Sequence, residues 1–442
     1  MERVEVAIVG GGVAGLAAAA ALRKRGHRVL VVEARDRPGG RILTMRDPKL
    51  PVPIELGAEF VHGDAPETTR LAHAAALPVC EVTGLHARAG RAGLRRVDYW
   101  RAIDRVLGRI PARGKDESFA AFLGRSPGGR ALANDRAAAL EFVQGFHAAD
   151  PERLGVRSIA PEAGERPSRT AARLARFVTG YDQLVAALAG DAGGGLRLRT
   201  AVTAVDWERS HVELTLRSHA GRRHRLAARA VVIAVPLGVL QAPPDAAGGL
   251  SLRPHPERVR RALGKLAMGT VTRVALALDE LPWPEASDPE AEGPLAGRLA
   301  FVHRPGAPFP VWWTAHPLRA PLLVAWTGGP AASALAGRTE GEIVDLALKT
   351  LAPLACTTPR RLRQRLRGAW THDWQSDPWS RGAYSYAGVG GAEAAALLAR
   401  PVQGTLFFAG EHTDALRSGT VEGGIASGLR AARQVHAARL RS

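Results

Sequence analysis

A glycine turn near the start of the chain constrains the fold more than any other feature. Residues 6–17 read VAIVGGGVAGLA, in which Gly10, Gly12 and Gly15 follow the pattern G-x-G-x-x-G. The β-branched run before the turn predicts a buried strand, the alanine-rich run after it predicts a helix, and residues 28–33 predict a second strand. Glycines at this spacing allow a tight turn and bring the backbone close to a pyrophosphate. The sequence therefore predicts a βαβ unit that binds a dinucleotide.

The acid at the end of the second predicted strand narrows the choice of dinucleotide. Glu33 can accept hydrogen bonds from both hydroxyls of a ribose, and it would repel a 2′-phosphate, so NADP is disfavoured. The segment 33–41 reads EARDRPGGR and contains a second glycine pair that NAD binding does not require. This segment resembles that of the two-dinucleotide-binding-domain flavoproteins. The resemblance implies FAD as the cofactor, with Arg35, Gly40 and Arg41 at its site.

Length and composition limit the class of protein. A chain of 442 residues predicts two or three domains, and a hydrophobic content of 46% is enough for a large core. No run of about 18 apolar residues is present, so we expect no membrane span. The first predicted strand begins by Val4, which leaves no room for a signal peptide, and Cys80 and Cys356 give no disulfide framework. We expect a cytoplasmic protein without a metal site.

The basic charge of the chain raises the question of a nucleic-acid partner. The formal net charge is +18, but only five of the 60 basic residues are lysines. Arginine and alanine are abundant along the whole chain, which indicates a compositional bias rather than a local basic patch. We therefore expect no nucleic-acid partner. A positively charged surface does not attract a cationic substrate, so selectivity for a cation has to come from local acids.

The C-terminal region carries a second glycine-rich motif. Residues 406–424 read LFFAGEHTDALRSGTVEGG, which predicts a strand ending near Glu411, then a loop, then a helix that begins after Gly419. Backbone N–H groups at such a helix start can face an anionic group. With this motif the chain resembles the flavin monoamine oxidase superfamily, in its branch of polyamine oxidases and lysine-specific histone demethylases. The segments that carry the resemblance are 33–42, 57–63, 234–240, 373–390 and 407–413.

The order of strand-rich and helix-rich segments predicts an α/β fold with interleaved domains. Helical spacing dominates residues 85–180, and strand patterns dominate residues 196–240. We predict a Rossmann-like FAD-binding domain built from three separate segments of the chain. We predict an α+β substrate-binding domain, with a helical part, built from the segments between them. The FAD-binding segments are 1–75, 195–255 and 400–442, and the substrate-binding segments are 76–194 and 256–399.

The resemblance assigns further residues to the cofactor. It implies that the backbone of Val202 meets the adenine and that Glu411 lies at the diphosphate-ribityl region. It places Gly419, Thr420 and Val421 at the pyrimidine edge of the flavin. Ala383 stands where some relatives carry a cysteine joined to the flavin. The FAD is therefore expected to be bound without a covalent link.

The resemblance also points to residues near the substrate amine. Trp374 and Tyr384 match aromatic positions beside the flavin, where an aromatic face attracts a cation and an apolar wall lowers the pKa of an amine. His62 matches a pocket histidine that orients the amine or moves a proton. Glu59 is predicted to pair with a distal ammonium. The structural alternative is that the aromatic side chains pack in the core and that His62 is bonded within a turn.

Arg273 departs from the family pattern. It stands where relatives carry a lysine that holds a water at flavin N5 and is linked to the reaction with oxygen. A guanidinium is planar, larger and permanently charged, so it does not replace an ammonium. The substitution reflects either the preference of the whole chain for arginine or slow reaction with oxygen and a different electron acceptor.

The resulting prediction is FAD-dependent oxidation of a polyamine or a related primary or secondary amine. Hydride transfer from the α-carbon to flavin N5 would give an imine, then an aldehyde, with molecular oxygen as the expected acceptor and H2O2 as the second product. The alternatives are an L-amino-acid oxidase, an amine dehydrogenase with another acceptor, and a non-catalytic flavoprotein scaffold. A histone demethylase is disfavoured because the chain has no room for a chromatin-binding domain. The identity of the amine and the oligomeric state stay open.

Overall fold

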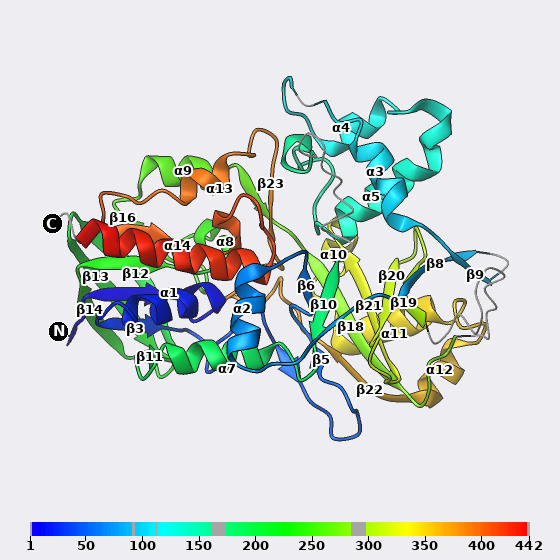
Figure 1. Ribbon diagram of the computed structural model, residues 1–442, viewed down its shortest axis with the longest axis horizontal. Helices are drawn as coiled ribbons and strands as arrows, with labels where there is room; N and C mark the ends of the chain where they lie inside the picture. Colours follow the sequence, from blue (N-terminus) through cyan, green and yellow to red (C-terminus); the bar gives the residue numbers. More distant parts are fainter. Residues whose placement is uncertain (1, 91–92, 112, 161–172, 284–297, 440–442) are drawn as a thin grey trace.

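A five-stranded parallel sheet confirms the predicted βαβ unit. The computed structural model describes residues 2–90, 93–111, 113–160, 173–283 and 298–439 (Figure 1). The strand order is β11-β3-β2-β15-β24, and every neighbouring pair is parallel. The strands are β2 (Val6–Val9), β3 (Val29–Val32), β11 (Leu196–Arg197), β15 (Ala230–Ile233) and β24 (Leu406–Phe408). Every residue of β2, β3 and β15 is buried, as in a parallel sheet covered on both faces.

Two helices from opposite ends of the chain lie side by side on one face of this sheet. Figure 1 shows α1 (Val13–Arg23) against α14 (Val421–Arg439). Glycine makes the approach possible, because a Cβ added to Gly428 would lie 2.1 Å from the carbonyl oxygen of Ala14. A Cβ on Gly15 would lie 2.0 Å from the carbonyl oxygen of Gly10, so the third glycine of the motif serves close packing.

Helix α7 (Asp182–Asp191) also packs against α1, although it belongs to the segment 76–194 predicted for substrate binding. Leu184 and Leu188 are buried in the hydrophobic core that lies under α1. The apolar face of α7 thus attaches it to the parallel sheet, which a boundary read from composition does not reveal.

A second sheet covers the other face of the parallel sheet. Its order is β1-β14-β13-β12-β16, and Leu214 and Val205 share a core with Ala7 and Val9 of β2. Its strands are β1 (Glu2–Arg3), β12 (Thr200–Glu208), β13 (His211–Ser218), β14 (Arg223–Ala228) and β16 (Ser251–Arg253). Helices from the segment 256–399 add to this core: α9 (Glu257–Leu263) and α13 (Ala394–Leu398).

A seven-stranded sheet forms most of the other half of the molecule. Its order is β22-β18-β21-β20-β19-β8-β9. The strands are β22 (Leu366–Thr371), β18 (Val271–Leu278), β21 (Leu322–Gly328), β20 (Val311–Thr314), β19 (Leu299–His303), β8 (Leu85–Gly90) and β9 (Gly93–Arg96). The helices that follow β21 in the chain are α10 (Pro330–Ser333), α11 (Glu340–Leu351) and α12 (Pro359–Arg365).

The predicted helical part is confirmed only after residue 98. Its described α-helices are α3 (Tyr99–Leu107), α4 (Phe119–Gly124) and α5 (Ala133–Gly145). The helical prediction is wrong for β8 and β9, which pair with each other at the sheet edge with β8 parallel to β19. Pairing with a strand more than 200 residues away outweighed the local helical pattern. The helical prediction is also wrong for β10 (Leu174–Phe177), which is the central strand of a three-stranded sheet.

Further short strands and helices complete the described part of the chain. They are β4 (Thr44–Met45), β5 (Ile54–Glu55), β6 (Phe60–His62), β7 (Val79–Glu81), β10 (Leu174–Phe177), β17 (Leu266–Met268), β23 (Ser385–Ala387), α2 (Pro66–Ala74) and α8 (Leu237–Gln241). Glu422 in the first turn of α14 accepts hydrogen bonds from the backbone N–H groups of Glu67 and Thr68. One carboxylate therefore caps α2 and fixes it to α14.

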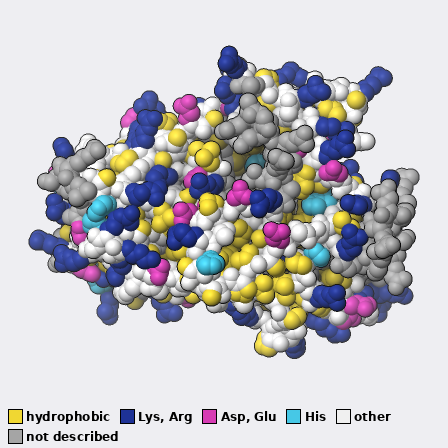
Figure 2. All heavy atoms as spheres, viewed as in Figure 1, with side chains coloured by type: hydrophobic (Ala, Val, Ile, Leu, Met, Phe, Trp, Pro, Cys, Tyr) yellow, Lys and Arg dark blue, Asp and Glu magenta, His cyan; other side chains and the backbone are white. Residues whose placement is uncertain are grey.

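The surface charge follows the composition. Figure 2 shows lysine and arginine side chains over the whole visible face, with acidic side chains between them, rather than in one basic patch. Among the helices of the described ranges, none combines the length and hydropathy needed to span a bilayer.

Replacing Gly428 by alanine tests the contact between α1 and α14. The added methyl group meets backbone, so we expect Gly428→Ala to lower the free energy of unfolding by about 1–3 kcal/mol. Gly341→Ala in α11 is the control, because no atom lies within 4 Å of its added Cβ. This control should raise stability by roughly 0.5–1 kcal/mol through helix propensity. Equal urea midpoints for the two variants would contradict the packing argument.

Candidate active site

A cavity of about 690 Å³ lies between the parallel sheet and the seven-stranded sheet. Its wall includes the start of α1, the end of β3, β6, β23 and the start of α14, and also residues of α5 and β18. This volume falls in the range of small-molecule and cofactor sites. The cavity brings the predicted substrate residues and the predicted cofactor residues to one place, except Gly15, which packs against the backbone of Gly10 outside the wall.

The glycine turn forms one end of the cavity. Gly10 has a φ of +105° and Gly40 a φ of +58°, conformations that L side chains rarely adopt. The first N–H groups of α1 have no acceptor within the helix, as at the start of any helix. Gly12 is the N-terminal cap of α1 and has no side chain that could accept a hydrogen bond from them. A Cβ added to Gly12 would meet no atom within 4 Å. The turn therefore leaves open space in front of a helix N-terminus, which fits a pyrophosphate.

Glu33 lies buried at the end of β3 beside this turn. Its Oε2 accepts a hydrogen bond of 2.6 Å from the N–H of Gly11, and its Oε1 accepts one of 2.8 Å from the N–H of Arg35. These contacts fix the carboxylate and leave lone pairs free for ribose hydroxyls. Val202 lines the same cavity, next to a β-bulge between Val202 and Ala204.

The side chain of Arg35 lines the cavity, and two of its hydrogen bonds go to other parts of the protein. Its Nη1 donates to Asp377 Oδ1 at 2.9 Å, and its Nη2 donates to Ser380 Oγ at 2.8 Å. Burial opposes ionisation of Asp377, but hydrogen bonds from His372 and Arg35 lower the pKa of Asp377 to about 2. The guanidinium thus fixes the loop after β22 to the end of β3, while Arg35 still lines the cavity.

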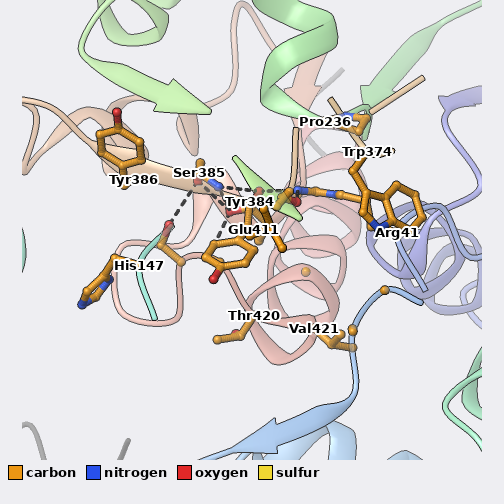
Figure 3. A pocket seen from close by; sticks show the side chains of 18 of the residues that line it. Arg41, His147, Pro236, Trp374, Tyr384, Ser385, Tyr386, Glu411, Thr420 and Val421 are labelled. Atoms are coloured by element: carbon orange, nitrogen blue, oxygen red, sulfur yellow. Dashed lines mark hydrogen bonds and ion pairs between the residues drawn. The ribbon is translucent and has the colours of Figure 1, made fainter. Parts of the chain in front are cut away.

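Arg41 and Glu411 form an ion pair at the centre of the cavity wall (Figure 3). Arg41 Nη1 donates to Glu411 Oε1 at 2.9 Å and to the carbonyl oxygen of Ala383 at 2.7 Å. Glu411 Oε2 accepts from Ser385 Oγ at 2.6 Å and from the N–H of Gly419 at 3.0 Å. Burial opposes ionisation, but Arg41, His412 and Ser385 together lower the pKa of Glu411.

The start of α14 lies beside this ion pair, as Figure 3 shows for Thr420 and Val421. Thr420 Oγ1 accepts a hydrogen bond of 2.9 Å from the N–H of Gly423, which caps the helix. The first N–H groups of α14 have no helical acceptor and lie at the cavity. The N–H of Gly419 donates to Glu411 and that of Thr420 to the carbonyl oxygen of Arg417, so among the three predicted residues Val421 is the one whose N–H fits an anionic edge of a flavin.

The aromatic residues predicted near the substrate also line the cavity. Tyr384 donates from its hydroxyl to the carbonyl oxygen of Phe146 at 2.7 Å, and burial raises the pKa of its phenol. Trp374 donates from Nε1 to the carbonyl oxygen of Leu56 at 2.8 Å. The polar atoms of both side chains are therefore satisfied by backbone, and each ring is held in one place at the wall.

His62 is a neutral histidine in the wall of the cavity. Burial lowers the pKa of its imidazole to about 4, and no described residue bonds to its buried Nδ1. The ring packs edge-on against Phe146 with centroids 5.4 Å apart. A neutral imidazole with a free ring nitrogen can accept a hydrogen bond from an amine, but it is a weak base for removing a proton.

Glu59 does not offer a free carboxylate, which corrects its predicted role. Its Oε1 lies 3.2 Å from Arg176 Nη1, and its Oε2 accepts hydrogen bonds from Arg273 Nη2 and Trp313 Nε1. Arg273 also donates from Nη1 to the carbonyl oxygen of Gly57 at 3.0 Å. The three charged side chains are at most 8% exposed. Both carboxylate oxygens are thus committed to cations of the protein.

The structure adds residues that the sequence did not single out. Ser385 bonds to Glu411, and Arg176 and Trp313 hold Glu59. Ser385 directly follows Tyr384 in the segment 373–390, so its place beside a predicted site residue could have indicated that it belongs to the site. Arg176 lies in a segment without any motif, and only the pairing of β10 with β6 brings it to Glu59.

The donor set fits FAD. Two helix N-termini, a ribose-binding acid and a buried ion pair line one continuous cavity. Ala383 also lines it and has no nucleophilic group, and neither Cys80 nor Cys356 contributes to the described wall. A cofactor held without a covalent bond is consistent with this wall.

Replacing Glu59 by glutamine tests the buried triad of Arg176, Glu59 and Arg273. The change leaves two buried guanidinium groups without an anion, so we expect it to lower the free energy of unfolding by about 3 kcal/mol. Glu213→Gln removes an ion pair with Arg225 at an exposed site and should cost less than about 1 kcal/mol. Thermal unfolding of the two variants gives the comparison. Equal losses of unfolding free energy would show that the buried triad stabilises the fold no more than an exposed ion pair does.

Comparison with known proteins agrees with the geometry of the site. Residues 13–436 match the family described as flavin containing amine oxidoreductase. Polyamine oxidase 4 of Oryza sativa subsp. japonica is 28% identical over 97% of this chain and 87% of its own length. Lysine-specific histone demethylase 2 of Homo sapiens is 26% identical over 98% of this chain, but the match spans only 53% of the demethylase.

Solved structures share the fold. Wild-type putrescine oxidase bound to putrescine superposes with a TM-score of 0.79 at 23% identity, covering 98% of this chain and 99% of the other. Cyclohexylamine oxidase from Brevibacterium oxydans IH-35A gives a TM-score of 0.79 at 21% identity over 99% of this chain and 100% of the other. The family match covers nearly the whole chain, and the residues predicted for FAD lie in the wall of one cavity, except Gly15. This chain belongs to the family of flavin-containing amine oxidoreductases, whose cofactor is FAD.

Proposed function

We propose that this protein is a cytoplasmic amine oxidase that acts on a polyamine or a related primary or secondary amine and passes the electrons to oxygen, giving H2O2. The observation that carries the proposal is the composition of the cavity wall next to the FAD site. Tyr384, Trp374 and the neutral His62 form an aromatic, uncharged surface there. Relatives named as a polyamine oxidase and a putrescine oxidase support an amine substrate.

The residues of the chain orient and desolvate the amine. FAD, when bound, supplies the acceptor for the hydride that leaves the α-carbon. The aromatic wall excludes water and lowers the pKa of the substrate ammonium, which favours the neutral amine. His62 Nδ1 accepts a hydrogen bond from the amine, and the fixed ring of Tyr384 limits its position. Water then hydrolyses the imine to an aldehyde and releases its nitrogen as ammonia or as a shorter amine.

An L-amino-acid oxidase requires a cation that is free to bind a carboxylate. Both terminal nitrogens of Arg273 already donate to Gly57 and Glu59, and Arg176 pairs with the same Glu59. A substrate carboxylate would therefore have to displace contacts of the protein. This part of the wall thus disfavours a carboxylate. Arg157 also lines the cavity, and its side chain is exposed and donates to the carbonyl oxygen of Gly114.

A panel of substrates tests this choice. Under nitrogen, a substrate that reduces the flavin bleaches its absorbance band at ~450 nm. We expect polyamines, diamines or alkylamines to cause this bleaching at least ~100-fold faster than L-amino acids of similar length. His62→Ala and Tyr384→Phe should slow the bleaching while FAD stays bound. Faster bleaching by L-amino acids would favour the alternative oxidase. No bleaching by any amine, with FAD bound, would favour a non-catalytic flavoprotein.

Arg273→Lys tests whether the arginine limits the reaction with oxygen. Its guanidinium is held by Gly57, Glu59 and the ring of Trp313, 5.3 Å away, so it is not free to hold a water as an ammonium does. We expect the variant to reoxidise roughly tenfold faster or more in air-saturated buffer, as measured by stopped flow. Arg176→Lys makes the same chemical change outside the described cavity wall and is the control. Equal rates for wild type and Arg273→Lys would show that the arginine does not limit this step.

A further inference from the structure

The end of the cavity under the helical part contains an acid that the mechanism does not use. In Figure 1 helices α3 and α5 lie above the seven-stranded sheet, away from α1. Glu141 belongs to α5 and lies one turn before Gly145, so both residues share a helix face, and both line the cavity. The remaining wall here comes from rings on α3, β8 and β19: Tyr99, Trp100, His86, Phe301 and His303.

The carboxylate of Glu141 has no hydrogen bond from the described part of the chain. Both of its oxygens are buried, and its side chain is 12% exposed. Among the described residues Arg88 forms an ion pair with Glu141, but its Nη2 lies 3.9 Å from Oε2, which is beyond hydrogen-bond distance. Burial raises the pKa of Glu141 to about 7, with Arg88 opposing the shift. A buried carboxylate without a donor is costly unless a ligand supplies one.

The surrounding rings are neutral and attract cations through their faces. Burial lowers the pKa of His86 to about 4, and burial, His86 and Arg88 lower the pKa of His303. The ring of Tyr99 stacks on His303 at 4.3 Å. Arg157 also lines the cavity, but its side chain is exposed and donates to the carbonyl oxygen of Gly114. Among the described lining acids, only Glu141 has no hydrogen bond to either oxygen.

A continuous row of rings joins Glu141 to the place of amine oxidation. His62 contacts Phe146 at 5.4 Å, Phe146 contacts Trp100 at 6.1 Å, and Trp100 contacts Tyr99 at 5.4 Å. The hydroxyl of Tyr384 donates to the backbone carbonyl of Phe146, which places Tyr384 next to this row. The wall between the two ends is therefore apolar and aromatic, which suits the methylene chain of a linear molecule.

We propose that Glu141 binds the distal ammonium of a diamine or polyamine whose other amine lies beside His62 and Tyr384. The inference rests on the proposed amine oxidation, and it assigns the recognition of substrate charge to the far end of the cavity. The carboxylate of Glu141 accepts the N–H donors of the ammonium, and the rings of Tyr99 and Trp100 surround the cation. Glu59 cannot take this role, since both of its oxygens bind arginine.

Pairs of substrates that differ in one terminal amine test the proposal. We would measure KM and kcat for α,ω-diaminoalkanes and for n-alkylamines of equal length, with wild type and Glu141→Gln. Wild type should favour each diamine by at least about tenfold in kcat/KM. Glu141→Gln should raise KM for diamines about 10- to 100-fold and leave the alkylamines within about twofold, since only diamines lose a charged hydrogen bond. Glu208→Gln changes the same charge at an exposed strand position and should have no effect.

Calorimetric titration without oxygen separates this proposal from the proposed function. Diamine binding that weakens in Glu141→Gln, together with a flavin that no amine reduces, would support the cation site and overturn amine oxidation. Amine oxidation in which the variant changes diamines and alkylamines equally, or neither, would overturn the cation site alone. If Glu141→Gln does not fold, Glu141→Asp is measured instead, because it keeps the charge but shortens the side chain. The proposal then requires a KM for diamines above that of wild type, with the KM for alkylamines unchanged. A wild type that favours alkylamines would refute the proposal without any variant.

Discussion

The buried carboxylate of Glu411 fixes the cofactor half and the substrate half of the site relative to each other. It pairs with Arg41, which lies 370 residues earlier, and it accepts hydrogen bonds from Ser385 and from the backbone of Gly419. Through these contacts one side chain fixes the glycine loop, the strand that follows Tyr384 and the start of α14. Burial alone would favour the neutral acid, but the surrounding donors keep its pKa low. The cofactor surface and the aromatic substrate surface can meet in one cavity because this ion pair fixes both.

Three glutamates of the cavity wall show that the partners of an acid decide its role. Glu411 has a guanidinium, a hydroxyl and backbone donors, and it organises the site. Glu59 lies between Arg176 and Arg273 and is neutralised by them. Glu141 has no donor from the described residues and a raised pKa. The residue type is the same in each case, so only the surroundings separate a structural carboxylate from one that is available to a cation.

Local motifs predicted the cofactor half of the site well, because each motif contains both the turn and the residue that it positions. The βαβ unit, Glu33 and the helix start at Val421 all follow from short contiguous segments. Long-range contacts were not predictable in this way. The pairing of Arg35 with Asp377 joins residues 342 positions apart, and the strand β8 pairs with β19, more than 200 residues later. Glu141 sits in an alanine-rich helix without a motif, and its exposure to the cavity follows only from tertiary packing.

The central claim is that this cavity, with FAD bound, oxidises an amine at its α-carbon. A single-turnover reaction under nitrogen tests it most directly, with the loss of flavin absorbance and the aldehyde formed counted in the same sample. We predict that an amine reduces the flavin fully and that one aldehyde forms for each flavin reduced. Amines that leave the flavin oxidised, or that reduce it without forming an aldehyde, would show that the cavity does not carry out this oxidation.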